Sequence, residues 1–98
     1  MDMDQLKELL DEVGISLSTD KVSNLILYND SVNDMLFVVL QLYEICGLNN
    51  EDAMQVMLEA HTKGKALVKE GSYEDMYALQ CRLNEKGLEA TVVLQFRS

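Results

Sequence analysis

The strongest structural signal in the sequence is a run of twelve residues, 35–46, in which almost every side chain is apolar (MLFVVLQLYEIC). The run is much shorter than the roughly 20 residues of a membrane-spanning helix, so it has to be buried in a protein core. Asn33 or Asp34 can cap its start, and Gly47 can end it. The pattern predicts a central helix that is buried on nearly all sides.

Shorter segments on both sides of this run supply the elements that could surround it. The expected elements are a strand over 23–29, the helix over 35–46, a second helix ending at Gly64, a strand over 65–69, a third helix from Ser72 to about Lys86 and a strand over 90–94. Asn49 or Asn50 can cap the second helix, and Ser72 with Asp75 resembles a capping box. The order β-α-α-β-α-β predicts an α+β domain whose three-stranded sheet is covered by helices on one face.

The first part of the chain is expected to be an appendage of this domain. Apolar residues recur at helical spacing over 3–13, and Gly14 follows them. We therefore divide the chain into 1–22, a short amphipathic helix with a linker, and 23–98, the core domain. Acidic residues stand at the start where a secretory signal needs basic ones, and no apolar run reaches membrane-spanning length. The sequence therefore predicts a cytoplasmic protein.

Charge and cysteine usage narrow the function. The net charge of −9 disfavours nucleic acid and anionic membranes as partners. Cys46 and Cys81 are far apart and, with a single histidine, give no spacing typical of a metal site, so we expect no metal and no cofactor. The stretch HTKGKA lacks the glycines and the Ser/Thr of a phosphate-binding loop. Nothing local supports a Cys–His nucleophile, and we expect a protein that recognises a partner and is not an enzyme.

Two polar features remain, and each has a purely structural interpretation. The loop that contains Asn29 and Asp30 can be a turn whose side chains bond the local backbone. His61, near the end of the second helix, can cap carbonyl groups there. A third interpretation joins them, because an amide oxygen, a carboxylate and a neutral imidazole can all accept hydrogen bonds from one ammonium group. With Met35, Met57 and Ala60 as an apolar hole beside these acceptors, the pattern is typical of N-terminal amine capture.

Residues 24–94 resemble the ClpS adaptor family, whose members bind proteins that carry destabilising N-terminal residues (N-degrons) and deliver them to a Clp-type AAA+ protease. The resemblance rests on LILYND at 25–30, on Met35 with Phe37-Val38, on Met57-Leu58, and on HTKGKA at 61–66. It implies a bacterial, monomeric adaptor of the N-end rule that works with an unfoldase of the ClpA or ClpC class.

The resemblance also implies roles for individual residues. Asn29 and His61 would bind the substrate α-amino group, and Asp30 would hold the amine and the first peptide unit. Met35 would be a gate against β-branched first residues. The peptide-binding residues carried over are Asn29, Asp30, Asn33, Met35, Met57, Ala60, His61 and Ala90, and Glu74 would contact the unfoldase.

Three departures from the family pattern concern the pocket. Asn33 stands where Thr or Ser is usual, Ala60 replaces a typical Val, and Ala90 occupies a position expected to be a pocket Leu. The two alanines predict a wider or shallower pocket and an altered or relaxed first-residue preference. On the unfoldase side, Leu79 occupies a position that is often Lys, which leaves the unfoldase undetermined.

Three other interpretations stay open at the level of the sequence. Residues 71–93 also resemble the closing helix and strand of the ribosomal stalk protein's C-terminal domain, a docking module with no use for Asn29, Asp30 and His61. The chain could instead be a degenerate adaptor with a different ligand. A thiol enzyme would lose its activity when Cys46 or Cys81 is alkylated.

Overall fold

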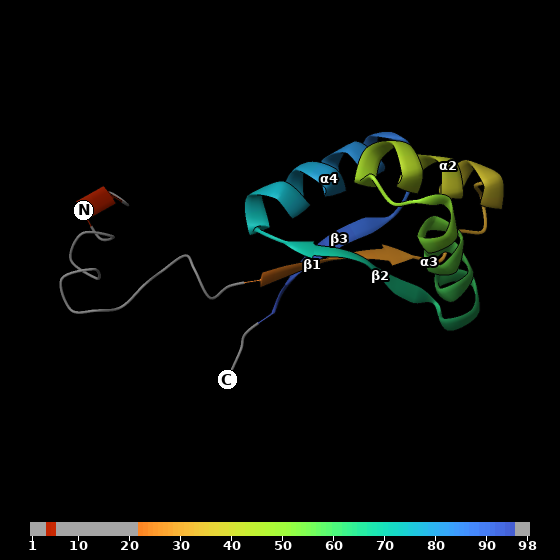
Figure 1. Cartoon of the computed structure of the whole chain (residues 1–98), viewed down its shortest axis with the longest axis horizontal. Helices are drawn as coiled ribbons and strands as arrows, with labels where there is room; N and C mark the ends of the chain where they lie inside the picture. The colour runs from red at the N-terminus through yellow and green to blue at the C-terminus, as the bar shows by residue number, and fades with distance from the viewer. Residues whose placement is uncertain (1–3, 6–21, 96–98) are drawn as a thin grey trace.

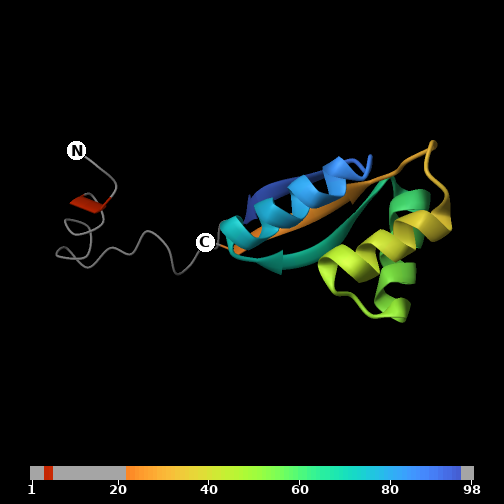
Figure 2. The same ribbon diagram turned by 90° about the horizontal axis from the view of Figure 1, so that it is seen from above.

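The computed structural model describes residues 4–5 and 22–95. The elements are β1 (Val22–Tyr28), α2 (Met35–Cys46), α3 (Asn50–Lys63), β2 (Lys65–Gly71), α4 (Tyr73–Glu85) and β3 (Ala90–Gln95). Helices α2 and α4 lie on one side of an antiparallel three-stranded sheet (Figure 1). The predicted order β-α-α-β-α-β is confirmed, and each strand and helix lies within two residues of its expected range. Seen from above, α4 runs along the sheet, and α2 crosses α3 next to the end of the sheet (Figure 2).

The sheet has the order β2-β1-β3, so the first strand is the central one. Its side chains alternate between a buried face, with Ser23, Leu25 and Leu27, and a face that is only partly covered. Leu27 lies opposite Ala66 on β2 and Ala90 on β3, and all three are buried. The helices therefore cover one face of the sheet, as the alternation of a half-buried antiparallel sheet requires.

The prediction that α2 is buried on nearly all sides was wrong. Val38, Leu42 and Ile45 are buried, but Leu36 is 75% exposed and Tyr43 is 51% exposed on the opposite side of the helix. A three-stranded sheet and two further helices offer enough surface to cover only one side of α2. A small domain buries a smaller fraction of its chain than a large one, so apolar residues remain at its surface.

Side-chain caps begin all three of the long helices in the described part of the chain. Asp34 accepts a hydrogen bond from the Leu36 N–H at 3.0 Å, and Asn49 accepts one from the Asp52 N–H at 2.7 Å. Ser72 caps α4 by accepting a hydrogen bond from the backbone N–H three residues on, at 3.2 Å. Of the two candidates at the start of α2, Asp34 is the cap, which leaves the Asn33 side chain for other contacts.

The N-terminal appendage is described at only two positions. Asp4 and Gln5 are helical, and the rest of the helix expected over 3–13, with its linker, lies outside the described residues. The division of the chain at residue 22 therefore stays a prediction. Among the helices of the described ranges, none is long and apolar enough to cross a membrane.

Candidate functional site

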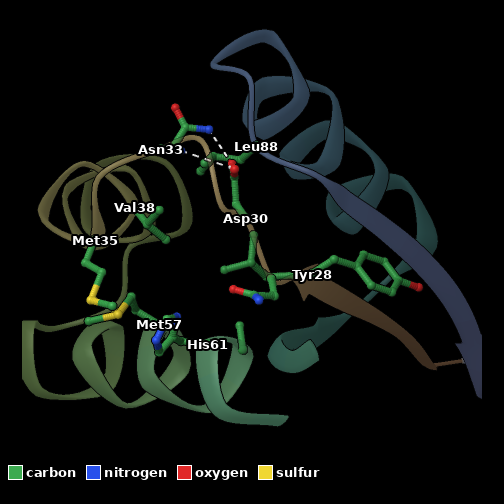
Figure 3. A pocket seen from close by; sticks show the side chains of 11 residues that line it. Tyr28, Asp30, Asn33, Met35, Val38, Met57, His61 and Leu88 are labelled. Atoms are coloured by element: carbon green, nitrogen blue, oxygen red, sulfur yellow. Dashed lines mark hydrogen bonds between the residues drawn. The ribbon is translucent and has the colours of Figure 1, made fainter. Parts of the chain in front are cut away.

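A small open cavity lies where the end of β1 meets α2, α3 and the turn before β3 (Figure 3). The residues that line it are Leu27, Tyr28, Asn29, Asp30, Asn33, Met35, Val38, Met57, Ala60, His61 and Leu88. Seven of the eight residues predicted to bind a peptide are therefore brought together here, although they come from three separate segments of the chain, the loop after β1, α2 and α3. Figure 3 shows the Tyr28 ring pointing away from the opening, so its contribution to the lining comes from the rest of the residue.

Backbone hydrogen bonds fix the end of β1 at the floor of this cavity. The Tyr28 N–H donates to the Glu89 carbonyl at 2.9 Å, and the Asn29 N–H donates to the Gly64 carbonyl at 2.9 Å. The first bond joins β1 to the turn before β3, and the second joins it to the glycine that ends α3. Asn29 thus lies at the junction of three chain segments, with an exposed side chain.

The Asp30 carboxylate is held by donors of its own loop. One of its oxygens accepts hydrogen bonds from the Val32 N–H at 2.7 Å and the Asn33 N–H at 3.2 Å, and the other accepts one from the Asn33 side-chain amide. These bonds, led by that of the Asn33 side chain, lower the pKa of Asp30 from its ordinary value of 3.8. Because its pKa is lowered, Asp30 is ionised at neutral pH. A carboxylate offers about four acceptor positions, and three donors already occupy it, so Asp30 can accept one further hydrogen bond.

Apolar side chains form the walls of the cavity. Met57 and Ala60 on α3 and Val38 on α2 are almost fully buried, and Leu88 is 3% exposed. Met35, in contrast, is 42% exposed, and its sulfur lies beside that of Met57 at the mouth of the cavity (Figure 3). Apolar walls with one flexible thioether at the entrance can contact an apolar side chain, and the thioether can adapt its position to it.

His61 is exposed in the last turn of α3, and Figure 3 shows its imidazole next to Met57. The carbonyl groups near this helix end have other partners: Thr62 donates its hydroxyl to the Leu58 carbonyl at 2.8 Å, and the Gly64 N–H donates to the Ala60 carbonyl at 2.9 Å. In the described part of the chain, no hydrogen bond joins the His61 imidazole to another residue. The structure therefore gives no support to a carbonyl-capping role, and the ring nitrogens are accessible.

Ala90 is the one predicted peptide-binding residue that is not among the residues that line the cavity. Its side chain is buried in the sheet opposite Leu27, and its N–H donates to the Asn84 side chain at 3.3 Å. Leu88, two residues earlier, occupies the wall instead. Of the two alanines, only Ala60 is among the residues that line the cavity.

Four residues line the cavity without having been predicted to do so: Leu27, Tyr28, Val38 and Leu88. Val38 could have been found, because it lies three residues after Met35 on the same helix and shares its side. Leu88 precedes β3 and belongs to the turn that follows Gly87, whose φ is +84°. Its position depends on that turn, and no periodic pattern of a helix or strand includes it.

Glu74 lies far from the cavity. It is exposed in the first turn of α4, at the end of the sheet where β1 begins (Figure 1). A shallow groove runs beside it between the end of β2 and α4, and its lining includes Lys69, Asp75 and Leu79. The residue assigned to the unfoldase and the cavity therefore lie at opposite ends of the sheet.

The two cysteines are free and differ in burial. Cys46 is buried, and burial raises the pKa of its thiol to about 11, although Lys69 and Arg82 act in the opposite direction. Cys81 is partly buried on α4. Within residues 4–5 and 22–95, no group of three or more His, Cys, Asp and Glu side chains is placed to hold a metal ion.

Comparisons with known proteins agree on one family. Residues 18–95 match the family model described as "ATP-dependent Clp protease adaptor protein ClpS". The ATP-dependent Clp protease adapter protein ClpS of Mycobacterium tuberculosis is 35% identical over 74 residues, which are 76% of this chain and 73% of that protein. The protein of the same name from Corynebacterium diphtheriae is 34% identical over 67 residues, or 68% of this chain and 59% of that protein.

A solved structure has the same fold. Agrobacterium tumefaciens ClpS2 bound to L-phenylalaninamide matches 79% of this chain and 100% of its own, with a TM-score of 0.69 and 22% sequence identity. At 22% identity, the match shows that the two proteins share a fold, and it does not show what this chain binds.

Proposed function

The chain belongs to the ClpS family of adaptor proteins of the ATP-dependent Clp protease, and on this premise we propose that its cavity captures the free amino terminus of substrate proteins together with their first side chain. The substrates would be proteins that carry N-degrons, and the adaptor would present them to the Clp machine. The adaptor itself would catalyse no reaction.

The observation that carries the proposal is the meeting of three acceptors and an apolar cavity. Asn29, Asp30 and His61 all border the same opening. A peptide α-amino group has a pKa of about 7.7–8.0, so at neutral pH it is largely a cation with three N–H donors. An ionised carboxylate, an amide oxygen and an imidazole nitrogen can take one donor each. N-terminal acetylation removes both the charge and two of the donors.

The apolar walls would take the first side chain. Burial of a leucine or phenylalanine side chain contributes roughly 1.5–3 kcal/mol, whereas micromolar binding needs about 8 kcal/mol. The ammonium contacts and bonds to the peptide backbone would have to supply the rest. The exposed thioether of Met35 at the mouth is placed to act as the gate that a β-branched first residue meets.

The ligand in the structure of similar fold has the groups that the proposal requires. L-phenylalaninamide, which the Agrobacterium protein binds, consists of a free amine, a benzyl side chain and an uncharged amide. These are the three groups of a peptide's first residue that the acceptors and walls of this cavity would meet.

The other end of the molecule would face the unfoldase. We propose that the exposed Glu74 contacts an AAA+ unfoldase of the ClpA or ClpC class. Because Glu74 and the cavity lie at opposite ends of the sheet, a single monomeric adaptor can bind substrate and unfoldase at the same time (Figure 1).

The test is a fluorescence-anisotropy titration with labelled peptides that begin with Leu, Phe, Tyr, Trp, Ile or Met, each with a free and with an acetylated amino terminus. The chain, Asp30→Ala and His61→Ala would be compared, with Glu51→Ala as the control for loss of an exposed acid outside the cavity. We expect micromolar or tighter binding that requires the free amine and both side chains and is unchanged in the control. Equal binding of free and acetylated peptides would contradict amine capture and favour a docking role without N-terminal recognition.

A further inference from the structure

The side chain of Asn33 connects two parts of the cavity that are far apart in the sequence. Its amide nitrogen donates to the second carboxylate oxygen of Asp30 and, at 3.0 Å, to the carbonyl oxygen of Gly87. The two acceptors belong to the loop after β1 and to the turn before β3. Figure 3 shows the Asn33 amide above the opening, beside the Asp30 carboxylate and next to Leu88.

The turn that Asn33 holds carries one wall of the cavity. Leu88 follows Gly87 directly and is nearly fully buried. On its other side, the turn is fixed to α4, because the N–H groups of Gly87 and Leu88 donate to the carbonyls of Asn84 and Leu83 at 3.0 and 3.1 Å. The hydrogen bond from the Asn33 side chain to the Gly87 carbonyl thus joins the turn that carries Leu88 to the loop that carries Asp30.

We propose that Asn33 is a positioning residue that sets the first-residue selectivity of the cavity, by fixing the distance between the Asp30 carboxylate and the Leu88 wall. This inference rests on the proposed function, because it assumes that the carboxylate holds the α-amino group and that the wall contacts the first side chain. With both ends fixed, a side chain that does not fit between the α3 wall and Leu88 cannot be accommodated by a shift of the turn.

The chemistry of the amide explains why asparagine suits this role. An amide nitrogen carries two hydrogens and can serve two acceptors at once. Threonine or serine, which the family resemblance implies at this position, has one hydroxyl hydrogen and can donate to only one of them. An alanine can donate to neither, and an aspartate would place a second negative charge against Asp30.

The experiment measures selectivity in Asn33→Ala and Asn33→Thr. Dissociation constants would be determined for free-amine peptides that begin with Phe, Leu, Ile or Val. The measure of selectivity is the ratio of the largest dissociation constant to the smallest. Asn50→Ala is the matched control, because this asparagine is exposed at the start of α3, outside the cavity. Thermal unfolding would verify that each variant is folded, and methyl relaxation of Leu88 without ligand would report directly on the wall.

We expect the ratio to fall by about tenfold in Asn33→Ala, the scale on which a pocket distinguishes one methylene group, and by less in Asn33→Thr. The Leu88 methyl groups should become more mobile in the same order, while Asn50→Ala keeps the native values. An unchanged ratio in a folded variant, with every peptide weakened equally, would overturn the proposal and leave amine capture intact.

Failure of the proposed function would give a different result. In that case the native chain itself would not distinguish free from acetylated peptides, and selectivity could not be the readout. The methyl relaxation of Leu88 would then be the only test of whether Asn33 fixes the Leu88 wall. Unchanged methyl mobility in both Asn33 variants would overturn that role, and increased mobility would support it.

Discussion

Among individual residues, Asp30 has a carboxylate that the hydrogen bonds of its own loop hold in place and keep ionised. Three donors from Val32 and Asn33 hold its carboxylate, and the Asn33 side chain contributes most to the lowering of its pKa. A group whose pKa is lower in the folded state stabilises the fold at pH values above its unfolded pKa. That contribution is lost as the pH falls through the lowered value.

This gives a prediction for the titration of Asp30. A carbon-detected NMR titration of its carboxyl group should show a midpoint below 3.8, the ordinary value for aspartate. In Asn33→Ala, which removes the largest cause, the midpoint should move up towards that value. Asn50→Ala, at an exposed position outside the cavity, serves as the control and should leave the Asp30 midpoint unchanged. An unshifted Asp30 midpoint in Asn33→Ala would show that the side-chain bond does not hold the carboxylate.

Ala60 lines the cavity, and a larger residue at this position tests whether the first side chain of a peptide reaches it. Ala60→Val adds two methyl groups to a wall residue that is 4% exposed. We expect peptides that begin with Trp to lose about tenfold in affinity relative to those that begin with Leu, since pocket size discriminates on this scale. Ala53→Val, at a buried position outside the cavity, controls for strain in α3. A Trp-to-Leu ratio that stays the same would mean that the first side chain does not reach Ala60.

For the secondary-structure elements, the caps decide where the loop ends and α2 begins. Asp34 accepts from the Leu36 N–H, so Asn33 is available for the cavity. We predict that Asp34→Ala lowers the free energy of unfolding by about 1 kcal/mol, a typical cost for loss of an N-cap. Urea denaturation would measure it, with Glu44→Ala on the exposed side of α2 expected to change stability by less than about 0.5 kcal/mol. Equal effects of both substitutions would contradict the capping role.

The elements also show which parts of the structure were predictable. The α2, α3 and α4 boundaries follow from local signals such as the Asn49 and Ser72 caps, and these were read correctly. The exposure of Leu36 depends on how much surface the rest of the domain offers, which no local pattern contains. Leu88, and not Ala90, lines the cavity because the α4–β3 turn, held by hydrogen bonds to Asn33 and to α4, determines which residue faces it. No local pattern predicts that turn.

In the whole molecule, the two proposed binding regions occupy opposite ends of one sheet, so each should be separable by mutation. Glu74→Lys reverses a charge at the start of α4, far from the cavity. We expect it to abolish stimulated degradation of an N-degron substrate by a Clp-type unfoldase and its protease, with peptide affinity within about twofold of native, as for distant sites that act independently. Glu85→Lys, at the end of the same helix, is the control. Normal degradation with Glu74→Lys would contradict the proposed unfoldase contact.

The most direct test of amine capture uses the smallest ligand that carries its chemistry. L-phenylalaninamide and N-acetyl-L-phenylalaninamide would be titrated into the ¹⁵N-labelled chain and followed by backbone amide shifts. We predict saturable shifts with the free amine at Asn29, Asp30, His61 and Leu88, around the cavity, and none with the acetylated compound. Shifts that are the same for both compounds, or that lie outside the cavity, would contradict the account.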